Sequence, residues 1–258
     1  MSQTKQTLNH IWYFAYGSNM YSKILTDRRK VKPVRSLPAV AKGYKLTFDL
    51  FGFPYFEPSF GNIIKINDIN NSKSTNESSA LIDNKSTFTD NIDVEGVLHL
   101  ITEEDYSTIR RTEGGNGNKG YGYQDIKIEC TSYEGETIEA STLLCISPNA
   151  WRGEARPSHR YLNLLIEGAK ENNISPNYQT YLNNLPYFQL ETNTQMIGKY
   201  LMLVIMFPFI LPMLLIFTLS TLTKFQPPVF VSVYMDGLNK VMWVLHDRFL
   251  KPCFGTGE

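Results

Sequence analysis

The chain has 258 residues, and its 25 Lys and Arg residues balance 25 Asp and Glu residues, so the formal net charge is zero. This length suits one domain with an appendage, and zero net charge argues against a nucleic-acid-binding protein, which is usually strongly basic. The three cysteines and four histidines are scattered and form no CxxC or HExxH pattern, so we expect neither a disulfide framework nor a metal site.

The first part of the chain predicts the start of a globular domain. Residues 1–10 lack an apolar stretch, so we expect no signal peptide. Ile11–Ala15 is apolar and aromatic and predicts a buried strand that opens into a glycine loop. A helix is predicted over Met20–Lys30. Alternating apolar residues predict one strand over Ala39–Leu50, and a further strand is predicted at Ile63–Ile66.

A polar segment, Asn67–Asp93, interrupts the domain. It consists mostly of Asn, Ser, Thr and Asp and has too few large apolar groups to offset the entropy of ordering. We therefore expect a flexible insertion between two strands. The sequons at Asn70, Asn76 and Asn84 would be glycosylated only if this segment faced a lumen, and such a composition also produces these triplets by chance.

The elements that follow are strands with a few inserted helices. Thr102 and three acidic residues after it predict a helix start, and Gly114-Gly115 predicts its end. The other expected elements are a strand at Val94–Leu100, a hairpin of Tyr123–Thr131 and Thr137–Ile146, and helices beginning at Ser158 and at Ser175-Pro176. This order is not regular βαβ alternation. It predicts an α+β fold with a mostly antiparallel, barrel-like sheet.

A long uncharged run, Tyr200–Thr223, lies between Lys199 and Lys224. As a helix it would measure about 36 Å, against about 30 Å for the hydrocarbon core of a bilayer. Pro208 and Pro212 interrupt the run, but membrane helices tolerate proline. We predict a transmembrane or re-entrant segment. The alternative is a buried core helix, which would need a large protein around it.

The last part of the chain mixes aromatic and basic residues. Over Val229–Lys251 this pattern suits an interfacial helix on lipid headgroups, or an amphipathic helix packed on the domain; its members are Tyr234, Trp243, Phe249, Lys240, His246, Arg248 and Lys251. The basic residues after the apolar run favour a cytoplasmic C-terminus. We divide the chain into a domain over 1–195, a membrane segment over 196–224 and an interfacial tail over 225–258, with the domain facing the cytoplasm.

Three local features carry chemical information. Tyr13–Asn19 predicts a strand that ends in Gly-Ser-Asn, whose backbone N–H groups could bind a carboxylate or phosphate, although a plain turn explains these residues equally well. Glu113 stands before two glycines and could face a cavity, although most such residues are solvated. Pro157–Tyr161 opens a helix, and Tyr161 is either a hydroxyl donor or a core aromatic residue.

Together these features resemble the γ-glutamylcyclotransferase family over about residues 11–187. Tyr13–Met20 is similar to the family's YGSN substrate-binding loop, Val94–Leu98 to its VxGxxY strand, and Glu113 stands where the family has its catalytic Glu. Pro157–Tyr161, followed by Gly168–Asn172, resembles the family's PSxxY and GAKEN segments. The chain departs from the family in the polar insertion, in a methionine where Leu is usual, and in the C-terminal apolar region.

The resemblance implies a reaction without a cofactor. The α-amine of a γ-glutamyl substrate attacks its own γ-amide carbonyl, which gives 5-oxoproline and a free amine. Glu113 is the implied catalytic base and acid, and the implied substrate-binding residues are Tyr13, Phe14, Ala15, Tyr16, Gly17, Ser18 and Tyr161. The expected partners are a small γ-glutamyl molecule and a membrane through the C-terminal segment, with a homodimer as an option and no nucleic acid.

Two other functions remain open from the sequence. The same fold could serve as a non-catalytic, membrane-tethered binding module for a γ-glutamyl or other small carboxylate ligand. The chain could also be a membrane interaction protein whose domain is a scaffold, although no sequence feature identifies a partner. The identity of the γ-glutamyl substrate is not encoded in any recognisable motif.

Overall fold

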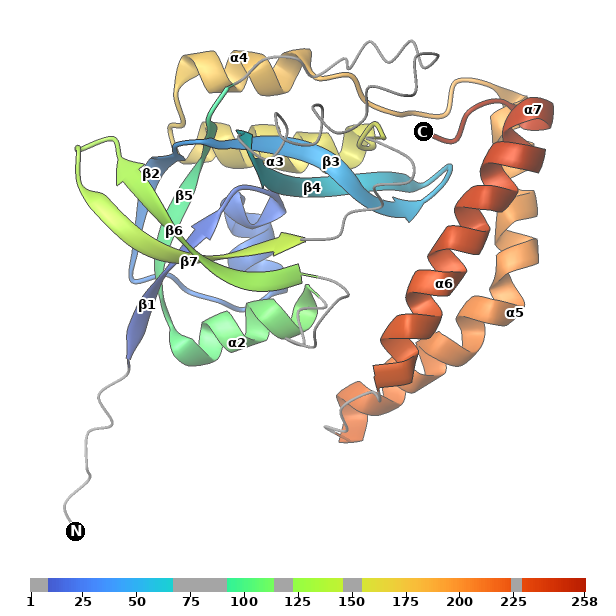
Figure 1. Cartoon of the computed structure of the whole chain (residues 1–258), viewed down its shortest axis with the longest axis horizontal. Coiled ribbons are helices and arrows are strands. Elements are labelled where there is room, and N and C mark those ends of the chain that lie inside the picture. Colours follow the sequence, from blue (N-terminus) through green and yellow to red (C-terminus); the bar gives the residue numbers. More distant parts are fainter. Residues whose placement is uncertain (1–8, 67–91, 114–122, 146–154, 224–228) are drawn as a thin grey trace, which may run out of the picture.

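A closed five-stranded barrel forms the centre of the computed structural model, which describes residues 9–66, 92–113, 123–145, 155–223 and 229–258 (Figure 1). The barrel strands follow the order β1-β5-β2-β6-β7, with bounds His10–Ala15 (β1), Arg35–Ala41 (β2), Val94–Thr102 (β5), Tyr123–Ser132 (β6) and Thr137–Cys145 (β7). Neighbouring strands are antiparallel except β1 and β7, which are parallel where Tyr13 faces Ser141. The predicted α+β barrel is therefore confirmed.

A second sheet of two antiparallel strands, β3 (Tyr44–Phe53) and β4 (Glu57–Lys65), lies beside the barrel. The single strand predicted over Ala39–Leu50 is wrong, because the chain turns at Gly43, whose φ is +76°. Glycine adopts this left-handed conformation without steric cost, so the chain can leave the barrel at this point and enter the second sheet. β4 also begins earlier than the predicted Ile63–Ile66.

The helices of the domain follow their local start signals, with one exception. The predicted helix over Met20–Lys30 is instead a 3₁₀ turn, η1 (Ser18–Met20), and a π-helical turn, η2 (Lys23–Arg28). In the described part of the domain the α-helices are α2 (Glu103–Thr112), α3 (His159–Glu171) and α4 (Pro176–Asn184). Each begins after a residue whose side chain accepts a backbone N–H of the first turn, and these residues are Thr102, Ser158 and Ser175 respectively. These caps are the ones the sequence predicts.

Some predicted features fall outside the described residues. They are the Gly114-Gly115 helix end, the polar insertion apart from its last two residues, and the sequons at Asn70, Asn76 and Asn84.

The barrel interior contains one buried imidazole, His99 on β5, whose Nδ1 lies 2.8 Å from the Ser36 hydroxyl. Burial lowers the pKa of His99 to about 4. Because this folded-state pKa lies below the usual value of about 6.5, unfolding takes up a proton between these pH values. The stability that the neutral, buried His99 contributes is therefore fully present above about pH 6.5 and is lost as the pH falls towards 4.

We expect this imidazole to make the fold sensitive to acid. Between pH 6.5 and pH 4, the free energy of unfolding should fall by about 3 kcal/mol more for the wild type than for His99→Gln, because glutamine does not titrate. Urea unfolding at several pH values measures both declines. Parallel declines in the two proteins would show that other groups cause the acid sensitivity.

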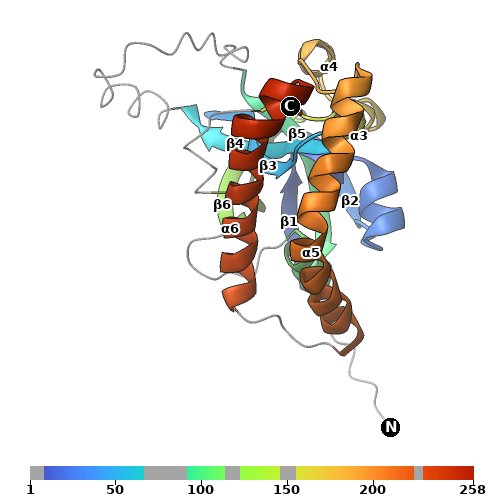
Figure 2. The ribbon, with the colours of Figure 1, turned by 90° about the vertical axis from the view of Figure 1, so that its right-hand side faces the viewer.

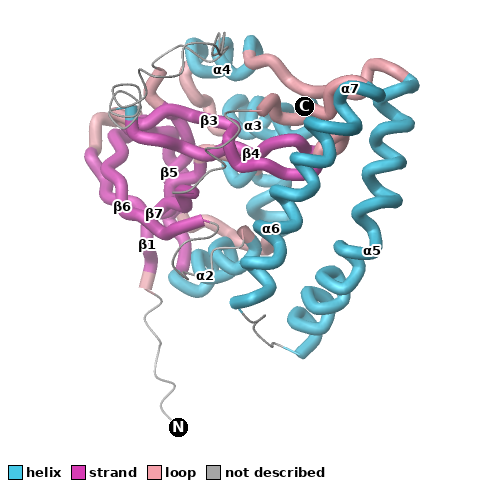
Figure 3. The backbone as a smooth tube through the Cα atoms, turned by 45° about the vertical axis from the view of Figure 1, so that its right-hand side comes forward, coloured by secondary structure: helices cyan, strands magenta, loops and turns pink. Residues whose placement is uncertain are grey.

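The C-terminal part forms two long helices, α5 (Asn193–Thr223) and α6 (Val229–Leu245), followed by η3 (His246–Leu250) and α7 (Lys251–Phe254). Figures 1 and 2 show α5 and α6 side by side, and in Figure 1 α6 is the helix nearer the barrel, where it contacts β3. Within the described ranges, the stretch Asn193–Ile216 of α5 is the one helix long and apolar enough to cross a membrane, and 17% of its apolar window is buried. The axis of α5 bends in Figure 3, in the half that contains Pro208 and Pro212.

The helix α6 packs on the outer face of β3. Trp243 is fully buried there, and its Nε1 donates a hydrogen bond to the Gly52 carbonyl at 3.1 Å. Asn239 Nδ2 donates to the Phe51 carbonyl at 2.9 Å. Trp243 is one of the aromatic residues that the sequence offers for lipid headgroups. Its side chain instead lies in a second hydrophobic core, separate from the barrel core, between α6 and β3. Of the two alternatives for this segment, packing on the domain describes α6.

Candidate active site

The loop that follows β1 presents two open backbone N–H groups. Gly17 and Ser18 are partly exposed, and within the described part of the chain their N–H groups donate to no other group. A Cβ atom on Gly17 would lie 3.3 Å from the Tyr161 hydroxyl, so the loop passes close to that side chain. Open amides beside a hydroxyl can bind a carboxylate or a polarised carbonyl oxygen.

The helix α3 fixes this loop from behind. A Cβ atom on Gly168 would lie 2.8 Å from the backbone nitrogen of Tyr21, which explains a glycine at this helical position. Asn172 Nδ2 donates to the Met20 carbonyl at 2.8 Å, and Glu171 Oε2 accepts the N–H of Ser22 at 3.0 Å. The GAKEN segment therefore acts as a support for the YGSN loop, although the two are far apart in the sequence.

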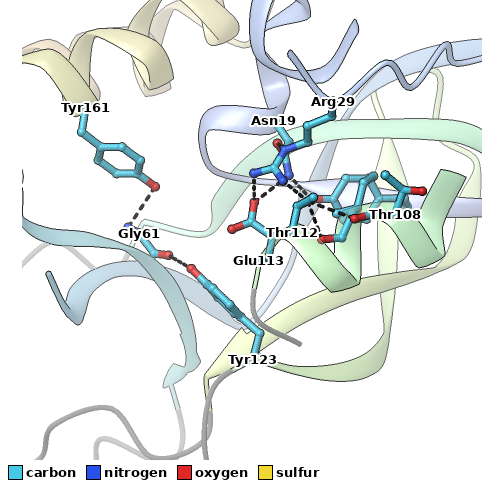
Figure 4. Close-up of polar contacts among 10 residues, drawn as sticks. Asn19, Arg29, Gly61, Thr108, Thr112, Glu113, Tyr123 and Tyr161 are labelled. Atoms are coloured by element: carbon cyan, nitrogen blue, oxygen red, sulfur yellow. Dashed lines mark hydrogen bonds and ion pairs between the residues drawn. The ribbon is translucent and has the colours of Figure 1, made fainter. Parts of the chain in front are cut away.

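The carboxylate of Glu113 lies at the end of α2, where its backbone N–H donates to the Ile109 carbonyl at 3.0 Å. Its Oε1 accepts a hydrogen bond from Asn19 Nδ2 at 3.2 Å and forms an ion pair with Arg29 (Figure 4). Among the described residues no donor reaches Oε2. The side chain is 24% exposed, so one oxygen is held and the other is free in a partly desolvated place.

Two further side chains complete this cluster. Asn19 Nδ2 also donates to the Tyr13 hydroxyl at 2.9 Å, and Arg29 Nε donates to Asn19 Oδ1 at 2.7 Å. Burial, followed by the charge of Glu113, raises the pKa of Tyr13, which therefore stays neutral. The site assignment from the sequence missed both Asn19 and Arg29. Asn19 belongs to the YGSN motif, but Arg29 lies in the charged run Asp27–Lys30, which gives no sign of an inward-facing side chain.

Tyr161 and Tyr123 meet the backbone of Gly61 on β4, across from Glu113 in Figure 4. The Tyr161 hydroxyl accepts the Gly61 N–H at 3.0 Å, and the Tyr123 hydroxyl donates to the Gly61 carbonyl at 3.2 Å. Burial raises the pKa of Tyr161, and the negative charge of Glu113 adds to this rise. Tyr161 therefore keeps its proton and, because its hydroxyl oxygen already accepts a bond, can donate that proton to a ligand.

The remaining residues implied by the resemblance lie beneath the loop. Tyr16 is buried, and its hydroxyl donates to the Leu143 carbonyl. The side chains of Phe14 and Ala15 are buried in the barrel core. A Cβ atom on Gly96 would lie 2.3 Å from the Ala15 carbonyl oxygen, so this glycine of the VxGxxY-like strand permits the close approach of β1 and β5. Phe14 and Ala15 therefore support the loop through the core.

The arrangement suits proton transfer without a metal ligand set. In the described ranges, no three His, Cys, Asp or Glu side chains come together as a metal site would need. The site instead offers a carboxylate with one open oxygen, two open amides and a protonated phenol. These groups can bind a carbonyl or carboxylate and move a proton to or from a nearby amine.

Known proteins share both sequence and fold with this chain. Residues 93–182 match the AIG2-like family. The chain is 30% identical to the γ-glutamyl cyclotransferase verK of Clonostachys rogersoniana over 156 residues, which cover 59% of this chain and 81% of verK. It is 28% identical to the γ-glutamyl cyclotransferase gliK of Aspergillus fumigatus over 256 residues, or 96% of this chain and 89% of gliK.

A solved structure of a γ-glutamyl cyclotransferase has the same fold, with a TM-score of 0.53 at 18% identity, covering 72% of this chain and 93% of that one. A human protein, described as uncharacterized protein loc79017, is equally similar in fold, with a TM-score of 0.53 at 19% identity, covering 71% of this chain and 92% of that one. The identity with verK shows that the chain belongs to the γ-glutamyl cyclotransferase family, and the barrel, the loop and Glu113 agree with this.

Proposed function

We propose that this protein cyclises the γ-glutamyl group of γ-glutamyl peptides or amines to 5-oxoproline and releases the free amino acid or amine. The observation that carries this proposal is the carboxylate of Glu113, whose Oε1 is held by Arg29 and Asn19 while no described residue donates to its Oε2. The names of the relatives verK and gliK support the same reaction class. A binding protein would have no use for a base in this place.

The reaction forms one C–N bond and breaks another. The α-amine of the substrate attacks its γ-carbonyl carbon and closes a five-membered ring, which is favoured because both groups belong to one molecule. Glu113 accepts the proton of the attacking amine and gives it to the leaving nitrogen as the original amide bond breaks. Both proton transfers return Glu113 to its starting state, so the reaction consumes no cofactor.

The other site residues bind and orient the substrate. The N–H groups of Gly17 and Ser18 stabilise negative charge on the substrate, either on the carbonyl oxygen during ring closure or on the α-carboxylate. Tyr161 donates its hydroxyl proton to the glutamyl group. Tyr13 and Tyr16, together with the backbone of Phe14 and Ala15, give the loop its shape.

A product assay tests this proposal. The full chain in detergent is incubated with γ-glutamyl dipeptides, γ-glutamyl amines and glutathione-type peptides, and 5-oxoproline and free amine are quantified. We expect the two products in equal amounts from at least one substrate class. If calorimetry detects binding of ligands that stay unconverted, the non-catalytic binding module is the correct function. Neither binding nor conversion of any compound would exclude both functions.

We also propose that the apolar helix α5 enters a membrane without crossing it, and that α6, which packs on β3, returns the chain to the same side, so that the two helices form a hairpin. The uncharged run of α5 and its many exposed apolar side chains support this, because a soluble surface rarely carries such a large patch. The C-terminal residues return to the domain, where the Tyr55 N–H donates to the Gly257 carbonyl at 2.9 Å. Gln195 Nε2 donates to the Thr256 carbonyl at 3.0 Å. A straight single span would break these contacts.

Cysteine labelling distinguishes the hairpin from a single span. Cys253 is exposed, whereas Cys130 and Cys145 are buried, so a membrane-impermeant maleimide should report on Cys253. In sealed vesicles we expect Cys253 and a cysteine introduced by Glu104→Cys in the domain to be accessible from the same side. Accessibility from opposite sides would contradict the hairpin. Complete release of the protein by alkaline carbonate would contradict membrane insertion altogether.

A further inference from the structure

We propose that Arg29 is a positioning residue for the cyclisation: it holds Oε1 of Glu113, which leaves Oε2 as the reactive oxygen, and it ties that carboxylate to the substrate-binding loop. This inference rests on the proposed function, since it assigns a role within the same site. Arg29 has no place in the motifs through which the chain resembles its family.

The guanidinium group of Arg29 has three partners from two separate parts of the chain. Its Nε donates to Asn19 Oδ1 at 2.7 Å, on the loop side. Its two terminal nitrogens donate to the Thr112 hydroxyl and to Glu113 Oε1, both at the end of α2 (Figure 4). The side chain is 13% exposed, so water competes little for these donors. A planar guanidinium group can make all three bonds at once, whereas an ammonium group cannot match this geometry.

The local fold aims Arg29 inwards. The residue directly follows η2, and its backbone N–H donates to the Ile24 carbonyl at 3.0 Å. Leu25 anchors η2 in the barrel core, and Lys30 has a φ of +62°, so the chain turns away immediately afterwards. The side chain of Arg29 is therefore placed by backbone geometry, while the neighbouring Arg28 is exposed.

The bonds of Arg29 also set the orientation of Asn19. Because Nε can only donate, it selects the amide oxygen of Asn19 as its partner. The amide nitrogen then points to Glu113 Oε1 and to the Tyr13 hydroxyl. Two donors consequently hold Oε1, and Oε2 is left as the proton acceptor. Without Arg29, the carboxylate could rotate and the Asn19 amide could turn over.

This role predicts a defect in the chemical step more than in binding. The groups proposed to bind the substrate are the N–H groups of Gly17 and Ser18 and the Tyr161 hydroxyl, and none of these donates to or accepts from Arg29. A misplaced carboxylate lowers the rate of proton transfer, and a displacement of about 1 Å can cost about 100-fold. Loss of Arg29 should therefore lower kcat and leave KM nearly constant.

The test compares four full-length proteins in the 5-oxoproline assay: wild type, Arg29→Gln, Arg29→Lys and the matched control Arg28→Gln. We expect kcat of Arg29→Gln to fall about 10- to 100-fold with KM changed less than about twofold. Arg29→Lys should recover part of this loss, because it restores the charge without the planar donors. Arg28→Gln should behave as the wild type.

Chemical rescue separates positioning from a general loss of structure. Low millimolar guanidinium ion should raise kcat of Arg29→Ala, since the ion can occupy the vacated place beside Glu113; no effect is expected on Arg28→Gln. A raised KM at constant kcat would mean that Arg29 binds substrate directly, and unchanged kinetics would mean that the ion pair is dispensable. Either result overturns this inference while wild-type activity remains. Absence of 5-oxoproline from the wild type would instead refute the proposed function, and the positioning role with it.

Discussion

Glu113→Gln should reduce 5-oxoproline formation by about 10²- to 10⁴-fold, the usual contribution of a positioned general base. Glutamine keeps an oxygen that can accept hydrogen bonds from Arg29 and Asn19, so the packing around the end of α2 can persist. What it loses is the ability to take a proton from the attacking amine. The defect should therefore appear in kcat, measured as 5-oxoproline released under saturating γ-glutamyl substrate.

The matched control for this variant is Glu104→Gln. Glu104 lies in the first turn of the same helix, α2, and is exposed to solvent. Its replacement should change kcat less than about twofold, because it removes only a weak interaction with the helix dipole. Equal rates for the wild type and Glu113→Gln would show that another group transfers the proton, and would remove the main support for the proposed mechanism.

Local signals in the sequence predict those elements whose boundaries depend on nearby residues. The caps at Thr102, Ser158 and Ser175 each satisfy a backbone N–H three residues further along, which a short sequence window contains. The β6–β7 hairpin is predicted for the same reason, since its turn contains Gly135 at a φ of +90°. Gly43 carries the same turn signal, but the alternating apolar residues on both sides conceal it.

Long-range contacts account for the features that the sequence does not reveal. Arg29 and Glu113 lie 84 positions apart in the sequence, with the strands β2 to β5 between them, and no periodicity links them. The resemblance to a family supplies the loop, Glu113 and Tyr161, but not the network that joins them. The pairing of the parallel strands β1 and β7, which closes the barrel, also cannot be predicted from the sequence. Pairing of distant strands depends on packing and not on local propensity.

The packing of α6 on β3 is another long-range contact that the sequence does not reveal, and it affects the candidate site. The sheet of β3 and β4 has two buried faces: Leu46, Phe48 and Ile63 belong to the barrel core, and Phe51 belongs to the core beneath α6, together with Tyr55 from the turn between the two strands. The strand β4 also carries Gly61, whose backbone meets Tyr161 and Tyr123. Helix α6 therefore supports, from the outside, the strand pair that forms one side of the site.

Trp243→Ala should lower the free energy of unfolding by about 3–5 kcal/mol, as expected for a large aromatic residue removed from a core. The indole ring is fully buried, its centroid lies 5.1 Å from that of Phe51, and its N–H donates to the Gly52 carbonyl. Truncation to alanine leaves a cavity and an unpaired carbonyl in the same place. Denaturant unfolding of the full chain in detergent, followed by far-ultraviolet circular dichroism, measures this loss.

Phe249→Ala is the matched control, because Phe249 is a large aromatic residue of the same C-terminal region but is exposed. Its replacement should change the free energy of unfolding by less than about 0.5 kcal/mol. Similar small effects for both variants would mean that α6 lies on lipid and not on β3.

If Trp243→Ala is destabilised as expected, its KM for a γ-glutamyl substrate should also rise. Loosening β3 displaces Gly61 on the paired strand β4, and Gly61 holds the Tyr161 hydroxyl beside the substrate-binding loop.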